Sequence, residues 1–311
     1  MKMANQIETI LEGRDGRRVV IGFGHRFVMI GERINPTNRK VLTKQLEAGD
    51  MTLVRRDARA QVEAGAQVLD VNVGFAGADE PAVMPLAVRA IMEEVDVPLC
   101  IDSPSAKAVE AGLVAFKEMG GKKALINSTT GELERMERYL PLAANYGAAI
   151  IGLAHDERGI NYDIDVRVES AAKIIEHARK EYGIGKEDIL IDPLTLTAGA
   201  NTLAAWTALE VQHRVWTELG VNTTTGASNV AFGLPDRTTI NVAYLPLMIS
   251  RGLTSAITNP LEKHIHKIIL AADVLMGRDP NALGWIKAFR AEQKAEAAAA
   301  PATPAPKLQN A

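Results

Sequence analysis

The chain has 311 residues, of which 47% are hydrophobic and 23% are charged, so it is long and apolar enough to bury a large core. Its formal net charge of -3 and its pI near 6.1 argue against the basic surface of a nucleic-acid-binding protein. The longest apolar segments fall far short of a membrane span, and the N-terminus MKMANQIETI lacks the apolar core of a secretory signal. We therefore expect a cytoplasmic protein that binds neither nucleic acid nor membrane.

The single cysteine, Cys100, limits the chemistry that the chain can perform. It excludes an internal disulfide and any zinc or iron–sulfur site built from several cysteines. His264 and His266 are two residues apart, and this spacing places them on different faces of a helix, so a metal-binding pair is not expected there. The sequence predicts no metal site.

Eight short apolar runs alternate with longer amphipathic segments along the chain. The runs are FVMIGERI (27–34), QVLDVNVG (67–74), PLCIDS (98–103), KALINS (123–128), AAIIGLA (148–154), ILIDPL (189–194), TTTGASNV (223–230) and SAITNP (255–260). The helix-like segments between them include 53–64, 80–94, 106–119, 133–146, 166–182 and 202–219. Strict alternation is typical of βα units with parallel strands, and eight such runs predict a single-domain (β/α)8 TIM barrel of the α/β class.

The barrel is expected over residues 28–290, between an N-terminal extension (1–27) and a C-terminal tail (291–311). The tail is rich in Ala and Pro and has too little apolar bulk to offset the entropy of ordering it, so we expect it to be flexible. A doubly wound open sheet is the competing architecture, but GFGHRF (22–27) lacks the third glycine of a dinucleotide-binding loop. We interpret that segment as a turn leading into the first strand.

Polar residues gather where the apolar runs end. These residues are Glu32, Asn35, Asp70, Asn72, Asp102, Asn127, Asp192, Ser228, Asn229 and Asn259. In a barrel such strand ends meet at one mouth, where active sites of this architecture lie, although any single residue could instead cap a helix or form a turn. Carboxylates and amides with few Lys or Arg among them suit a neutral heterocycle with N–H donors, such as a pterin, better than a phosphate.

Seven segments, in this order and at these spacings, resemble the pterin-binding methyltransferases: IGERIN, EAGAQVLDVNVG, LCIDSPSAKAVEAGL, ALINSTTGE, YGAAIIGL, LIDPL and GASNV. The resemblance is closest to the methyltetrahydrofolate:corrinoid methyltransferases of one-carbon metabolism and covers roughly residues 28–290. It implies a TIM barrel, usually a homodimer, that binds tetrahydrofolate or 5-methyltetrahydrofolate in its mouth. It also implies methyl exchange between N5 of the folate and the cobalt of a corrinoid (cobalamin). The chain has no Asp-x-His-x-x-Gly corrinoid motif, so a partner corrinoid protein would carry that group.

The resemblance also implies roles for individual residues. It places the pterin clamp on Asp102, Asn127 and Asp192, and the catalytic amide on Asn229. The other folate-binding residues that it suggests are Asp70, Asn72, Gly226, Ser228 and Arg237, of which the last could instead meet the corrinoid. Acetogen-type members carry a glutamine where this chain has Phe232, so the contacts of that glutamine do not carry over.

An amide beside N5 would serve a chemical purpose. A tertiary amine is a poor leaving group, so transfer from N5 to cob(I)alamin requires a proton or a strong hydrogen bond as charge develops on the nitrogen. Asn229 would supply that hydrogen bond mainly in the transition state. In the reverse direction the neutral N5 amine attacks methylcobalt(III), and the sequence does not assign the physiological direction.

Two other functions stay open. Dihydropteroate synthase also holds a pterin in a barrel, but it places a lysine in its strand-seven motif, and GASNVAFGLPDR has none. A non-catalytic pterin-binding protein, or a docking subunit for a corrinoid protein, would keep the clamp without needing Asn229.

Overall fold

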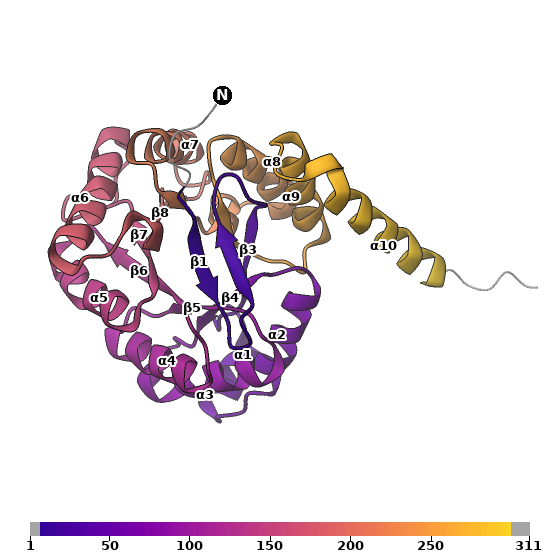
Figure 1. Ribbon diagram of the computed structural model, residues 1–311, viewed down its shortest axis with the longest axis horizontal. Coiled ribbons are helices and arrows are strands. Elements are labelled where there is room, and N and C mark those ends of the chain that lie inside the picture. The colour runs from indigo at the N-terminus through magenta and orange to yellow at the C-terminus, as the bar shows by residue number, and fades with distance from the viewer. Residues whose placement is uncertain (1–6, 300–311) are drawn as a thin grey trace, which may run out of the picture.

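Eight parallel strands form a nearly closed barrel in the computed structural model, which describes residues 7–299 and their side chains up to residue 295 (Figure 1). The strands are β3 (Val28–Ile34), β4 (Val68–Asn72), β5 (Leu99–Asp102), β6 (Leu125–Thr130), β7 (Ala149–Leu153), β8 (Ile189–Asp192), β9 (Asn222–Thr223) and β10 (Ser255–Thr258). They pair in the order β10-β3-β4-β5-β6-β7-β8-β9. Beyond β9, Gly226 pairs with Ile257 of β10, which brings the two edges of the sheet together. The predicted TIM barrel is confirmed.

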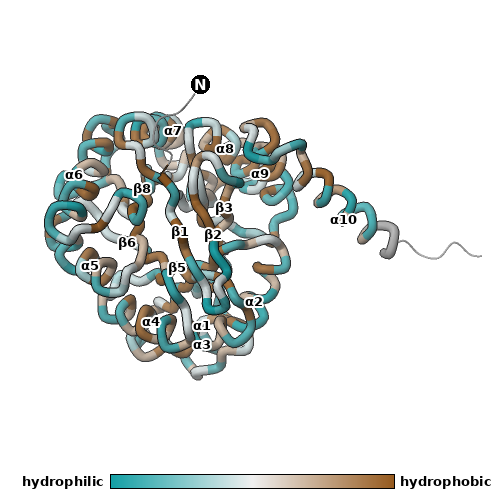
Figure 2. The backbone as a smooth tube through the Cα atoms, in the orientation of Figure 1, coloured by the Kyte–Doolittle hydropathy of each residue, from teal (hydrophilic) through white to brown (hydrophobic). Residues whose placement is uncertain are grey.

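A ring of helices covers the outside of the barrel (Figure 1). They are α1 (Lys40–Glu47), α2 (Thr52–Glu63), α3 (Glu80–Glu94), α4 (Ala106–Glu118), α5 (Leu133–Tyr146), α6 (Ile164–Tyr182), α7 (Ala204–Arg214), α8 (Arg237–Ser250) and α9 (Lys263–Leu275). The last helix, α10 (Leu283–Ala299), packs against α9 and projects away from the barrel (Figure 1). Figure 2 shows hydrophobic residues along the central strands and a mixture of both kinds along the surrounding helices. Strands covered on both faces read as continuous apolar runs, which is why the runs were recognisable in the sequence.

The N-terminal extension contains a β-hairpin that the sequence did not predict. Strands β1 (Thr9–Glu12) and β2 (Arg18–Ile21) pair antiparallel and lie across one end of the barrel (Figure 1). The side chains of Leu11 and Ile21 are fully buried and belong to the same apolar cluster as the strand residues that fill the barrel. The amide of Asn222 on β9 donates hydrogen bonds to the backbone oxygen of Ile21 (2.8 Å) and to Thr9 Oγ1 (3.0 Å). The hairpin therefore closes the end of the barrel opposite the carboxyl ends of the strands.

The GFGHRF segment (22–27) lies between β2 and β3 and contains the hydrogen bond from His25 N to Gly22 O (3.0 Å), so it is a turn as predicted. The apolar run 223–230 gives a strand of only two residues, because Ala227–Ala231 forms a 3₁₀ helix, η3, after Gly226. At the other end of the chain, the boundary expected at residue 291 falls inside α10, which continues to Ala299 because alanine favours helix. Residues 300–311 of the expected tail lie outside the described residues.

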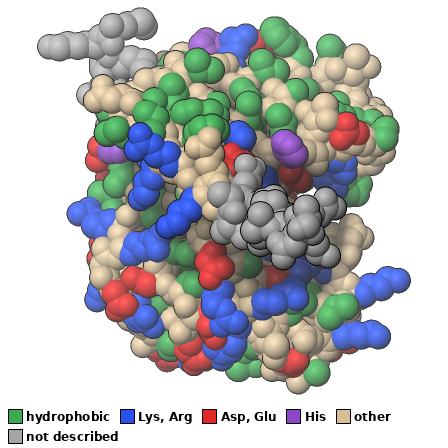
Figure 3. All heavy atoms as spheres, turned by 90° about the vertical axis from the view of Figure 1, so that its right-hand side faces the viewer, with side chains coloured by type: hydrophobic (Ala, Val, Ile, Leu, Met, Phe, Trp, Pro, Cys, Tyr) green, Lys and Arg blue, Asp and Glu red, His purple; other side chains and the backbone are tan. Residues whose placement is uncertain are grey.

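The face of the molecule in Figure 3 carries acidic and basic side chains interspersed with apolar ones. Such a mixture agrees with the small net charge of -3. Within residues 7–299, no helix combines the length and the apolar character that crossing a membrane requires.

Candidate functional site

Five of the predicted site residues lie on four barrel strands. Asn72, Asp102 and Asp192 are the last residues of β4, β5 and β8, whereas Asp70 and Asn127 lie within β4 and β6. Asn72 is in register with Asp102, and Asp102 with Asn127, so their side chains start from neighbouring positions around the mouth. The structure thus places Asn72, Asp102 and Asn127 at neighbouring positions around one end of the barrel, and their role in binding a ligand stays a prediction.

Two crossed hydrogen bonds join the amides and carboxylates of this cluster. Asn72 Nδ2 donates to Asp102 Oδ2 (2.8 Å), and Asn127 Nδ2 donates to Asp70 Oδ1 (3.1 Å). Asn72 Oδ1 in turn accepts from the backbone N–H of Gly74 (2.8 Å). Within the described residues, neither Asn127 Oδ1 nor Asp102 Oδ1 has a hydrogen-bond partner, so both are available to accept from a ligand.

Burial strongly affects the carboxylates of the cluster. Desolvation raises the pKa of Asp102 to about 6, although the hydrogen bond from Asn72 opposes it. Asp70 is 2% exposed, and burial together with the nearby charge of Asp102 holds its pKa well above the usual range. Among residues 7–295, no Lys or Arg forms an ion pair with Asp70 or Asp102. A ligand that donates N–H groups would therefore meet acceptors that the protein itself leaves partly unsatisfied.

Asp192 faces the mouth from the other side of the barrel. Its Oδ1 accepts hydrogen bonds from the backbone N–H of Leu194 (2.7 Å) and from Thr225 Oγ1 (3.1 Å). Thr225 Oγ1 also lies 2.8 Å from Thr195 Oγ1, which is 3.0 Å from the hydroxyl of Tyr244. Burial raises the pKa of Asp192 to about 6. A second buried carboxylate is thus held in a fixed orientation.

The loop that carries Asn229 is anchored on both sides. Ser228 Oγ donates to the carboxylate of Glu32 on β3, at 3.1 Å from each oxygen, and Arg237 Nη2 donates to the backbone oxygen of Ser228 (2.8 Å). Asn229 itself is exposed, and its amide lies over Gly226, where a Cβ atom would come within 2.7 Å of Nδ2. Glycine at that position therefore lets the amide approach the backbone closely.

Two further side chains of this loop are exposed. The guanidinium of Arg237 lies 5.7 Å from the ring centre of Phe232, the residue whose contacts were not carried over from the resemblance. Phe232 is 58% exposed, so it presents an apolar surface beside the loop of Asn229.

The sequence reading left out three residues that the structure places around the site. Glu32 was recognised as a strand end but not assigned to the folate site, and Thr225 lies directly before the GASN segment. Arg167 on α6 donates to the backbone just after Asp192. Thr225 could have been found from its position at the end of a strand-like run, whereas nothing in the sequence marks Arg167 as buried.

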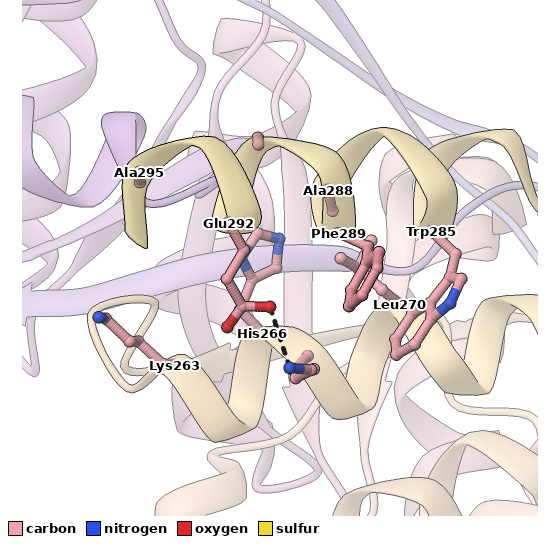
Figure 4. Close-up of a pocket in the computed structure, with 10 residues that line it drawn as sticks. Lys263, His266, Leu270, Trp285, Ala288, Phe289, Glu292 and Ala295 are labelled. Carbon is pink, nitrogen blue, oxygen red and sulfur yellow. Dashed lines mark hydrogen bonds and ion pairs between the residues drawn. The ribbon is translucent and has the colours of Figure 1, made fainter. Parts of the chain in front are cut away.

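A separate cavity of ≈ 430 Å³ lies between α9 and α10, outside the barrel. Figure 4 shows Trp285 and Phe289 of α10 facing α9, and Lys267 Nζ of α9 donates to Glu292 Oε2 of α10 (3.0 Å). None of the residues that line it belongs to the mouth cluster, by which we mean Asp70, Asn72, Asp102, Asn127 and Asp192. In the described part of the chain, no group of three or more His, Cys, Asp or Glu side chains is arranged to hold a metal ion.

Comparison with known proteins agrees with this geometry. The family described as pterin binding enzyme matches residues 31–259. The methylcorrinoid:tetrahydrofolate methyltransferase of Eubacterium limosum is 31% identical over 268 residues, which cover 85% of this chain and 96% of that protein. The methionine synthase of Mycobacterium leprae is 31% identical over 249 residues, which cover 75% of this chain but only 20% of that longer protein.

Solved structures extend the comparison to the fold. A dihydropteroate synthase of Xanthomonas albilineans superposes with a TM-score of 0.63 at 17% identity, over 86% of this chain and 98% of that one. At this identity the likeness concerns the barrel alone. The family match and the methyltransferase relatives together show that the chain belongs to the pterin-binding enzymes and is a methyltransferase of that family.

Proposed function

We propose that this protein moves a methyl group between N5 of tetrahydrofolate and the cobalt of a corrinoid carried by a partner protein, in the cytoplasm. The observation that carries the proposal is the array of buried and half-buried carboxylates and amides at the mouth, joined by hydrogen bonds and with acceptor oxygens left open. The relatives support the same class of reaction, since one is named for methyl transfer between a methylcorrinoid and tetrahydrofolate.

The mouth cluster would bind the pterin ring by its N–H groups. Asp102 and Asp192 would accept from the amino group and ring N–H of the pyrimidinone edge, and Asn127 Oδ1 would accept a further hydrogen bond. A hydrogen bond to an ionised acceptor is worth about 1.5–3 kcal/mol, and a buried carboxylate gains more from it than an exposed one does. Asp70 and Asn72 would orient Asn127 and Asp102 through their hydrogen bonds.

Asn229 would act on N5 itself. When the methyl group leaves, the N5–CH3 bond breaks, a Co–CH3 bond forms with the electron pair of Co(I), and N5 takes up a proton. A hydrogen bond from the amide of Asn229 would stabilise the charge that develops on N5 before that proton arrives. The exposed position of Asn229 leaves its amide free to turn toward a bound folate.

The corrinoid would approach the open end of the barrel, because the hairpin of β1 and β2 closes the other end. Arg237 and Phe232 are exposed beside Asn229 and would meet either the folate tail or the incoming corrinoid protein. We further propose that the protein acts as a homodimer, as the resemblance implies. A non-catalytic pterin-binding or docking subunit is the alternative that the experiment below separates.

The test is an anaerobic assay with the purified protein, 5-methyltetrahydrofolate and free cob(I)alamin, in which the absorbance of cobalamin is monitored. The reverse reaction is then measured in the same way. Formation of methylcobalamin would support the proposal, and comparison of the two rates would indicate the favoured direction. The matched control is Asn229→Ala, which should bind folate normally and lose turnover. If the wild-type protein binds folate but transfers no methyl group to cobalamin or to a corrinoid protein, a binding function replaces the enzymatic one.

A further inference from the structure

Arg167 is the largest fully buried side chain in the described part of the molecule. It lies in the first turn of α6 and is 1% exposed. Arginine is almost never fully buried unless its charge and hydrogen bonds are satisfied, since desolvation of the guanidinium is costly. Its position therefore calls for a specific role.

The guanidinium holds the segment that follows Asp192. Arg167 Nη1 donates to the backbone oxygens of Pro193 (3.1 Å) and Leu194 (2.9 Å), and Nε donates to the backbone oxygen of Asn161 (2.7 Å). The rigid fork of an arginine can hold two carbonyl groups at once, which a lysine cannot do in the same geometry.

The segment that Arg167 holds has an unfavourable backbone. Leu194 has a φ of 63°, in the left-handed region that side chains other than glycine rarely adopt. In that conformation its N–H donates to Asp192 Oδ1 (2.7 Å), while its oxygen accepts from Arg167. The same residue thus links the buried guanidinium to the carboxylate, and Arg167 stabilises the conformation that orients Asp192.

Arg167 also brings a positive charge close to Asp192 without a direct ion pair. The second terminal nitrogen, Nη2, is buried and has no hydrogen-bond partner among the described residues. Burial raises the pKa of Asp192, and the positive charge of the Arg167 guanidinium opposes that larger effect by lowering it. The other titratable side chain that faces this carboxylate is Tyr244 of α8, whose pKa is raised by burial, so it is neutral at physiological pH.

We propose that Arg167 is a positioning residue for pterin binding, which fixes the 192–194 segment and supplies the buried positive charge that balances the carboxylate of Asp192. The inference rests on the proposed function, because it takes Asp192 to be an acceptor for the pterin. It adds a residue from an outer helix that does not itself reach the ligand.

Two variants separate the two parts of this role. Arg167→Gln removes the charge, so the midpoint of the Asp192 titration should rise by more than about 0.3 pH units. Arg167→Lys keeps the charge but loses the fork, so it should leave that midpoint within about 0.3 units and weaken folate binding about 10-fold. Arg179→Gln, on the exposed face of the same helix, is the matched control and should change neither quantity.

The titration is measured on the ligand-free protein by ¹³C NMR of labelled aspartate carboxyl groups, with Asp192→Asn to assign the signal. Binding of 5-methyltetrahydrofolate is measured by calorimetry at several pH values, and thermal unfolding shows that each variant is folded. A midpoint in Arg167→Gln equal to that of the wild type would overturn the charge role. Unchanged folate affinity in Arg167→Lys would overturn the positioning role, and this variant decides the question if Arg167→Gln does not fold.

The same data distinguish this proposal from the proposed function. If the wild-type protein binds folate but transfers no methyl group, the reaction is wrong while the role of Arg167 in binding stands or falls by its own variants. If the wild type binds no folate, Asp192 is not a pterin acceptor and both proposals fail, although the titration still reports the coupling between Arg167 and Asp192.

Discussion

Replacing Asp102 with asparagine should weaken folate binding while leaving the fold intact or more stable. Asparagine has nearly the same shape as aspartate, so the variant tests charge and hydrogen bonding with little change in packing. In the wild type, Asp102 Oδ2 accepts from Asn72 (2.8 Å), and Oδ1 is open to a ligand. If the new amide keeps its oxygen toward Asn72, it turns its NH2 group toward the mouth, where it opposes the N–H donors of the pterin.

The size of both effects follows from the environment of this carboxylate. Losing a hydrogen bond to a charged acceptor costs about 1.5–3 kcal/mol, which corresponds to about 10- to 150-fold in the dissociation constant. Burial raises the pKa of Asp102 from its ordinary value of 3.8 to about 6, and a shift of this size means that ionisation costs the folded protein about 3 kcal/mol. Asparagine removes that cost and the repulsion with Asp70, so the melting temperature should rise or stay constant.

The assay combines calorimetry with 5-methyltetrahydrofolate at pH 7.5 and thermal unfolding without ligand. The matched control is Asp163→Asn, an exposed residue whose Oδ1 accepts from the backbone N–H of Val166 (3.1 Å) at the start of α6. Asparagine caps helices as well as aspartate does, so the control should change neither affinity nor stability. Unchanged folate affinity in Asp102→Asn would refute the placement of Asp102 in the pterin clamp, and a lower melting temperature would refute the argument from its buried charge.

Three further predictions address the amide, the pH dependence and the hairpin. Asn229→Ala should reduce the rate of methyl transfer about 100- to 1000-fold in stopped-flow absorbance of cobalamin, with folate affinity nearly unchanged; a comparable loss of affinity would contradict its action in the transition state. Burial raises the pKa values of Asp102 and Asp192 to about 6, so the ligand-free protein should lose stability as the pH rises from about 4 to about 6. Folate should bind more tightly over the same range, because the carboxylates ionise and become better acceptors. If stability in thermal unfolding and folate affinity in calorimetry rise or fall together with pH, the pKa values given to Asp102 and Asp192 are wrong. Leu11→Ala should lower the free energy of unfolding by about 2–5 kcal/mol in urea, because Leu11 is fully buried, and should not affect folate affinity; equal stability would show that the hairpin does not contribute to the barrel core.

Most of the barrel strands could be predicted from the sequence, but the hairpin that closes one end and the true length of β9 could not. Buried parallel strands must be apolar on both faces, so most of the strands were visible as runs of Val, Ile and Leu. The hairpin of β1 and β2 was missed because only alternate residues of each strand are well buried, so the strands lack a continuous apolar run. The length of the short strand β9 was overestimated for a different reason, since the residues of η3, which follow Gly226, continue the run in composition but form a 3₁₀ helix.

The candidate site shows a similar division. Residues at strand ends, such as Asp102 and Asn127, could be located because the topology brings the ends of parallel strands together. The partners of these residues could not be located in the same way. The hydrogen bond between Ser228 and Glu32 joins residues 196 positions apart, and the contact of Arg167 with Leu194 depends on how α6 packs on β8. Contacts of this kind depend on tertiary packing, so they cannot be predicted from a local sequence pattern.

The crossed hydrogen bonds also explain how the mouth could select its ligand. An asparagine amide can present either a donor or an acceptor, so Asn127 alone carries no fixed preference. Asp70, buried beneath it, accepts from Asn127 Nδ2 and thereby leaves Oδ1 as the group that faces a ligand. With Asp102 and Asp192 also accepting, the cluster offers acceptors to a ring edge that donates, and an isostere lacking those N–H groups would leave buried acceptors unpaired. Discrimination between such ligands would therefore depend on Asp70, which would not need to touch either of them.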